Sequence, residues 1–230
     1  FRIGLSPTGS KDPFALRRAA NAVVKILAES ELKLAIDDVV YATRNLAGRS
    51  DENLLKEVKA FLVERLRFFL KDEHGFTYDI VNAVLAAETP EIDVRDTIAR
   101  AEALTAMRGS EDFTAVSAAF KRMKNIVRQA YEKGFEFSQR SGQYMAAQEA
   151  EKFNEFANAL IPKVAILRQQ RAYGEALSLI ATMRPTVDAF FDKVMVLDDN
   201  PAVRGANVVL LENVLRGFSG IADFSEIVTS

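Results

Sequence analysis

The sequence contains no cysteine, no tryptophan and a single histidine among its 230 residues. Without cysteine it has no disulfide, no thiolate nucleophile and no cysteine zinc site. One histidine cannot supply the several ligands of a metal phosphohydrolase centre, and no G-x-S-x-G elbow of a serine hydrolase is present. The sequence alone therefore predicts a chain with no catalytic residue and no metal ligand of its own.

Long apolar runs are also missing. No stretch approaches the roughly 18 apolar residues that a membrane span needs, and the first residues lack the pattern of a signal peptide. These absences predict a cytoplasmic protein with no membrane partner. The chain opens on Phe1, which predicts a fragment of a longer protein.

The composition is that of a folded protein, with 49% hydrophobic and 27% charged residues. Apolar residues recur at three- and four-residue spacing in nearly every segment, which predicts an all-α fold. Asp12 and Pro13 mark the first helix start, and Arg108-Gly109-Ser110 marks a stop and restart. We therefore expect two packed helical domains, residues 1–109 and 110–230. The expected helices span about 13–29, 32–47, 51–73, 77–88, 92–108, 111–133, 144–170, 173–183, 185–196 and 201–222.

Several motifs that resemble sites have simpler explanations. The stretch GLSPTGSK, residues 4–11, lacks the glycine-lysine order of a phosphate-binding loop. His74 follows a helix, where a capping or surface position is expected. Asp188 and Asp192 share a helix face, which we interpret as a solvated face, and Asp198-Asp199-Asn200 is explained by helix capping.

A basic cluster is harder to dismiss. Residues 119–140 have two acids, Glu132 and Glu136, and six cations: Lys121, Arg122, Lys124, Arg128, Lys133 and Arg140. Helical spacing places Lys121, Asn125 and Arg128 together, away from the apolar stripe of the helix. This arrangement favours binding to a polyanion such as RNA, although charge alone is explained at least as well by a solvated helix face.

Three motifs carry a resemblance to a known family. They are PTGSKDPFALRR (Pro7–Arg18), KRMKNI (Lys121–Ile126) and VDAFFDKVMV (Val187–Val196). Together they resemble the carboxyl-terminal segment of the bacterial glycyl-tRNA synthetase β subunit. The second motif is similar to an element of the anticodon-binding domain in that family, which is related to that of arginyl-tRNA synthetase.

The resemblance implies that catalysis and tRNA binding are carried out by different subunits. Glycine activation, with its ATP and magnesium, is expected in a separate α subunit of a heterotetramer, and this segment needs no cofactor. The second domain is expected to be an anticodon-binding helical bundle for glycine tRNA. The residues expected to hold the tRNA are four cations at phosphates (Lys121, Arg122, Lys124 and Arg128) and one amide at a base or sugar (Asn125).

Two alternatives remain open from the sequence. Arg17 and Arg18 are further candidates for tRNA contact, or they serve packing and ion pairs between helices. The chain as a whole is alternatively a helical scaffold that binds a protein partner and no RNA.

Overall fold

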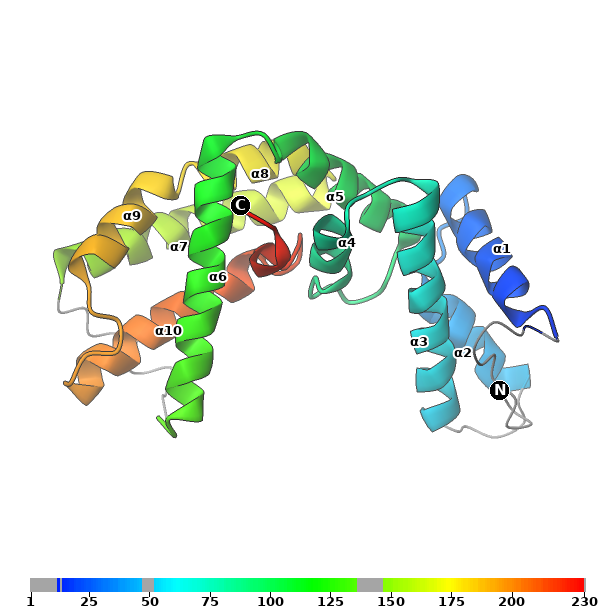
Figure 1. The fold of residues 1–230 in the computed structure, drawn as a ribbon, viewed down its shortest axis with the longest axis horizontal. Coiled ribbons are helices and arrows are strands. Elements are labelled where there is room, and N and C mark those ends of the chain that lie inside the picture. The colour runs from blue at the N-terminus through cyan, green and yellow to red at the C-terminus, as the bar shows by residue number, and fades with distance from the viewer. Residues whose placement is uncertain (1–11, 13, 47–51, 136–146, 230) are drawn as a thin grey trace. The chain divides into compact units, whose positions relative to one another are not determined.

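The fold is helical throughout the residues that the structure, a computed structural model, describes: 12, 14–46, 52–135 and 147–229. This confirms the predicted all-α class. Figure 1 shows the helices in chain order. They are α1 (Leu16–Glu29), α2 (Ile36–Leu46), α3 (Glu52–Phe68), the π-helix η1 (Phe69–Glu73), α4 (Tyr78–Leu85), α5 (Val94–Met107), α6 (Glu111–Glu132), α7 (Gln148–Gln169), α8 (Tyr173–Ala181), α9 (Arg184–Lys193), α10 (Pro201–Phe218) and the 3-10 helix η3 (Phe224–Glu226).

The contacts divide the chain into two units. Unit 1 consists of two stretches of the chain, the residues up to Val81 and the segment Thr89–Ala101. Unit 2 consists of the segment Asn82–Glu88 and the chain from Glu102 onward. The division falls inside α5. The expected domain boundary near residue 109 stays a prediction.

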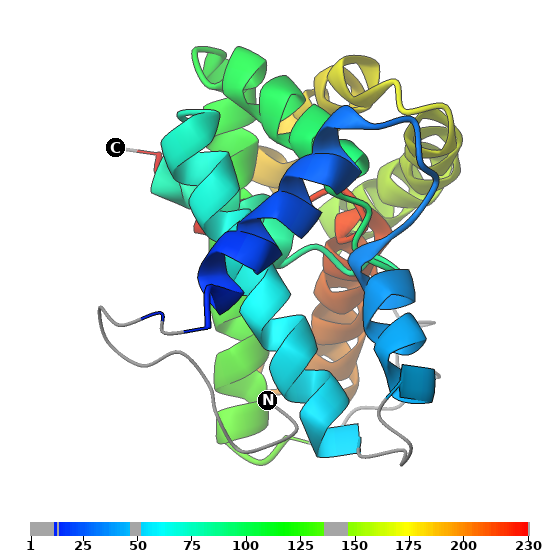
Figure 2. The same cartoon turned by 90° about the vertical axis from the view of Figure 1, so that its right-hand side faces the viewer.

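Unit 1 is built on α3, against which α1 and α2 pack (Figure 2). The buried residues of α1 are Ala20, Val24 and Leu27, at the three- and four-residue spacing that defines one helix face. Burial of this apolar face against α3 is what keeps α1 in place.

The start of α1 differs from the prediction. Asp12 Oδ1 does accept a hydrogen bond from the Arg17 backbone N–H, at 3.3 Å. The helix nevertheless begins at Leu16, because Ala15 has a φ of 55° and this left-handed conformation cannot belong to a right-handed helix. Pro13 and the stretch 4–11 lie outside the described residues.

Unit 2 is organised around α6, which packs against α8, α9, α10 and η3. The buried residues of α6 include Phe113, Val116, Phe120 and Met123, as their spacing predicts. Phe120 contacts the ring of Phe224 in η3, with 5.0 Å between centroids, and that of Phe218 at 5.9 Å. The core of unit 2 therefore holds the C-terminal end of the chain against α6.

Two expectations about the ends of helices in unit 2 are wrong. The helix expected over 185–196 ends at Lys193, and Met195 beyond its end is 73% exposed. The helix expected to reach residue 222 ends at Phe218, after which the chain turns into η3.

Candidate nucleic-acid interface

Four cations of the basic cluster, Lys121, Arg122, Lys124 and Arg128, lie on α6, whereas Lys133 follows the helix and Arg140 lies outside the described residues. Ser110 caps the helix, accepting a hydrogen bond from the Phe113 backbone N–H at 3.3 Å. Glu111 and Asp112 lie in the first turn, where negative charge is favourable. The cluster is thus carried by a rigid element.

The side of α6 away from the core presents Lys121, Asn125 and Arg128, here called the outward row. Lys121 and Arg128 are exposed, as their spacing predicts, whereas Asn125 is half-buried. Arg128 Nη2 donates to Asn125 Oδ1 at 3.3 Å, which orients the amide. Whether this row binds RNA stays a prediction.

Arg128 also has an acidic neighbour. Its Nε lies 3.7 Å from Glu132 Oε1, and the two side chains are 67% and 65% exposed. An exposed pair of this kind is worth little and is screened by salt. Arg128 therefore keeps its capacity to bind a phosphate.

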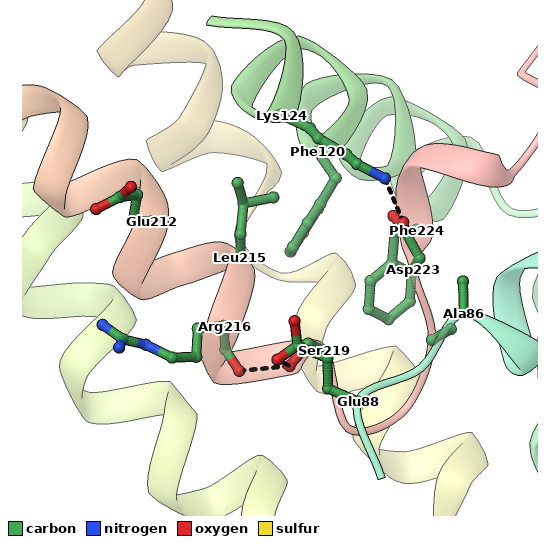
Figure 3. A pocket seen from close by; sticks show the side chains of 11 residues that line it. Ala86, Glu88, Phe120, Lys124, Glu212, Leu215, Arg216, Ser219, Asp223 and Phe224 are labelled. Carbon is green, nitrogen blue, oxygen red and sulfur yellow. Dashed lines mark hydrogen bonds and ion pairs between the residues drawn. The ribbon is translucent and has the colours of Figure 1, made fainter. Parts of the chain in front are cut away.

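Lys124 has a different environment from the outward row. Its Nζ donates to Asp223 Oδ2 at 2.5 Å (Figure 3). It also donates to Ser225 Oγ at 3.2 Å. The lysine side chain is half exposed. Lys124 thus joins α6 to η3, a structural role that the sequence did not indicate.

Asp223 is the centre of this junction. Its Oδ1 accepts from the Ser225 backbone N–H at 3.1 Å, which caps η3. Burial by itself raises the pKa of this carboxyl, but hydrogen bonds from Lys124 and Ser225, with the positive charge of Lys124, hold the pKa below its ordinary value.

The Asp223→Asn variant is expected to be less stable than the parent chain at pH 7, by about 0.5–1 kcal/mol, because it loses the ion pair but keeps a capping oxygen. A lowered pKa in the folded state contributes stability that is complete above the unfolded value of about 3.9 and is lost as pH falls through the folded value. The melting temperatures of the parent chain and of Asp223→Asn, measured between about pH 3 and 7, should therefore converge at the acid end of this range. Asp192→Asn, a substitution at an exposed position of α9, is the control. If the difference in melting temperature between Asp223→Asn and the parent chain were the same at every pH, the ion pair would not be the source of the lost stability.

Arg122 stacks on an aromatic ring. Its guanidinium carbon lies 4.1 Å from the centroid of Phe191, at the end of α9. Arg122 is exposed, whereas Phe191 is half-buried. The sequence gave no signal of this pair, since the two residues are distant in the chain.

Two hollows flank α6. The first, about 390 Å³ in volume, lies between α6 and α10 (Figure 3). Its polar side chains are already paired within the chain, Lys124 with Asp223 and the Ser219 hydroxyl with Glu88 at 2.9 Å. The second, about 520 Å³, lies beside Arg122 and is lined by side chains of α6, α9 and the following segment.

Arg17 and Arg18 lie in unit 1. Arg18 is exposed and Arg17 is half-buried, with its backbone N–H held by Asp12. The cluster on α6 belongs to unit 2, and contact of Arg17 and Arg18 with tRNA stays a prediction.

The remaining motifs have structural roles. His74 caps η1 through its backbone N–H, which donates to the Phe69 carbonyl at 3.1 Å. Asp188 Oδ2 lies 3.7 Å from Arg184 Nε on the exposed side of α9. Asn200 Oδ1 accepts from the Ala202 backbone N–H at 2.9 Å and caps α10. These contacts confirm the capping interpretations of His74 and Asn200.

The described segments bring no three histidine or acidic side chains together as a metal site would. In the part of the chain that the structure covers, no helix is both long and apolar enough to span a membrane.

Comparison with known proteins identifies the family. A model of the glycyl-tRNA synthetase beta subunit matches residues 1–86. The chain is 54% identical, over its whole length, to 33% of the glycine–tRNA ligase beta subunit of Acidobacterium capsulatum. It is 35% identical, over 98% of its length, to 32% of the protein of that name from Shewanella oneidensis, and 35% identical, over its whole length, to 33% of that from Shouchella clausii.

The helical chain and its matches define the class as that of aminoacyl-tRNA synthetase subunits. The chain belongs to the glycyl-tRNA synthetase beta subunit family. It spans about a third of the length of these curated relatives. The matches do not support the predicted position of the chain at the carboxyl end of the subunit.

Proposed function

We propose that unit 2 binds the anticodon arm of glycine tRNA through the exposed side of α6. The observation that carries this proposal is the outward row of Lys121, Asn125 and Arg128, presented on a rigid helix in a chain whose relatives are named glycine–tRNA ligase beta subunits. Lysine and arginine neutralise backbone phosphates, which supplies most of the affinity of such interfaces. The net charge of the chain is −2, so attraction must come from this local surface.

Each residue of the row has a distinct task. Lys121 is a mobile point charge for one phosphate, and Arg128 presents a planar fork to another. They are seven residues apart, which is about 10 Å along the helix axis. Because Asn125 Oδ1 already accepts from Arg128, its amide N–H groups are what it offers to a base or a 2′-hydroxyl.

A salt series tests this proposal. Filter binding of the chain to glycine tRNA should weaken steeply as salt rises, since each anchored phosphate releases counterions. Lys121→Ala combined with Arg128→Ala is expected to flatten the plot of log affinity against log salt by about two units.

The matched control removes two exposed lysines of α7, with Lys152→Ala and Lys163→Ala. This control lowers the net charge equally but should leave the slope within about half a unit of the parent, because it removes no anchor. Binding that is independent of salt, or equal effects of both double variants, would reject α6 as the anchor.

The proposal extends to the whole enzyme. We propose that the chain serves in a glycine–tRNA ligase as part of the β subunit, beside an α subunit that binds ATP and magnesium and activates glycine, in a heterotetramer. The name beta subunit carried by the relatives supports an α partner. Co-sedimentation of the chain with that α subunit tests the contact, and separate peaks for the two would speak against it.

The rival function is a helical scaffold that binds protein and no RNA. It is favoured by large apolar side chains exposed in unit 1, including Phe14 at 60%, Tyr41 at 61% and Ile26 at 54%. The filter-binding experiment separates the two functions, because a scaffold of this kind retains no tRNA at any salt concentration.

A further inference from the structure

The stacked pair of Arg122 and Phe191 is the feature that the phosphate-anchoring function leaves unused. The central carbon of the guanidinium lies 4.1 Å from the ring centroid, within the range at which a cation and an aromatic ring attract each other. Among the described residues, no other partner of Arg122 is found. Phe191 lies against the guanidinium and Arg122 is exposed, so we expect the opposite face of the guanidinium to be the one that solvent reaches.

The ring beneath Arg122 is held firmly. Phe191 packs edge-on against Phe190, with 5.2 Å between centroids. Phe190 is fully buried and contacts Phe153 of α7 at 5.0 Å. This chain of aromatic contacts joins the surface pair to the core, so the plane of the guanidinium is pre-organised rather than mobile.

A hollow of about 520 Å³ adjoins this plane. Ile126 and Val194 supply apolar lining, and Met195, which is 73% exposed, stands at its edge. Lys193 and Asp192, both exposed, add one cation and one carboxylate to the lining. A mostly apolar hollow beside a planar cation, with a carboxylate that repels phosphate, suits a flat aromatic group better than a phosphate.

Arg122 is also next to the outward row on α6. It lies three residues before Asn125 and directly after Lys121, so it occupies the neighbouring row of the same helix. An RNA strand anchored by its phosphates on the outward row has its bases within reach of the hollow.

We propose that an unpaired base of the bound RNA stacks on the open face of Arg122 and enters the hollow beside Phe191. The inference rests on the proposed function and assigns Arg122 a task other than phosphate anchoring. Guanidinium planes and aromatic rings are the surfaces on which proteins stack splayed-out bases, and such stacking tolerates any base because each has a π-face. A base-paired strand cannot use the hollow, since its bases are covered.

The test uses Arg122→Lys, which keeps the charge and removes the plane. The probes are an oligouridylate of about ten nucleotides with one central 2-aminopurine, and an RNA duplex of the same length. Affinity of Arg122→Lys for the single strand is expected to fall about tenfold, with the salt slope and the affinity for the duplex unchanged. Binding to the parent chain should quench the fluorescence of 2-aminopurine, and binding to Arg122→Lys should not.

Arg216→Lys is the matched control, because it makes the same change at an exposed arginine of α10 that belongs neither to the outward row nor to the hollow. It should change the affinity for either probe by less than about twofold. Both variants alter exposed side chains, and equal melting temperatures of the two confirm that folding is intact.

The outcomes distinguish this inference from the function on which it rests. If the parent chain binds the single strand and Arg122→Lys binds it equally well, with quenching retained, the stacking site is overturned and phosphate anchoring survives. If the parent chain binds neither RNA probe nor glycine tRNA, both proposals fall.

Discussion

Phe120→Ala is expected to lower the free energy of unfolding by about 3–5 kcal/mol, the cost of deleting a fully buried phenylalanine. Phe120 is 2% exposed and lies between the rings of Phe218 and Phe224. Removing it leaves a cavity between α6, the end of α10 and η3. Neighbouring helices relax only partly around such a cavity, so its lining loses contacts.

The measurement is thermal unfolding followed by circular dichroism. A loss of this size in a chain of 230 residues corresponds to a fall of roughly 10 °C in the melting temperature. Ile166→Ala, on an exposed position of α7, is the control and should change stability by less than about 0.5 kcal/mol. If the two variants melt alike, the aromatic contacts do not hold the C-terminal end against α6.

Arg100→Met is expected to lower stability by about 3 kcal/mol through a different mechanism. Arg100 lies in α5 and is 2% exposed, with its Nε 2.9 Å from Asp96 Oδ2 and its Nη2 3.1 Å from Thr97 Oγ1. Methionine fills much of the same volume but leaves the carboxylate of Asp96, whose side chain is 18% exposed, without this cation. Removing one partner of a buried pair costs far more than the pair contributes, because the remaining charge is desolvated.

Arg95→Met gives the comparison on the same helix. Arg95 is exposed and donates to the Ser30 carbonyl at 3.1 Å. Its replacement removes a hydrogen bond to a carbonyl that water can reach. We therefore expect the free energy of unfolding, measured with urea, to fall by about 0.5 kcal/mol. If Arg100→Met also lowered the free energy of unfolding by only about 0.5 kcal/mol, the Asp96 carboxylate would have to be stabilised by another cation or by water.

The α6 helix combines folding and surface functions in adjacent rows. Lys124 serves folding, through Asp223 and Ser225. Lys121 and Arg128 remain on the surface, and Arg122 is fixed on Phe191. Cations that are adjacent in sequence therefore differ in what they can bind, because a helix turns by about 100° at each residue.

Much of the fold follows from local pattern. The buried stripe of α6, from Phe113 through Phe120 to Met123, and the caps at Ser110 and Asn200 agree with what spacing and capping chemistry predict. These features depend on residues three or four apart, which a helix brings together whatever surrounds it. The starts and ends that were wrong, at Ala15 and after Lys193, depend on backbone conformations that apolar spacing does not encode.

The sequence by itself determined the all-α class, the outward row on α6 and, through its motifs, the family. Only the tertiary structure decided which cations remain available. Asp223 is 99 residues from Lys124 in the chain, and Phe191 is on a helix distant from Arg122, yet packing brings each pair into contact. Local periodicity fixes the face on which a side chain lies, whereas its partner is set by how the helices pack, which depends on the whole core at once.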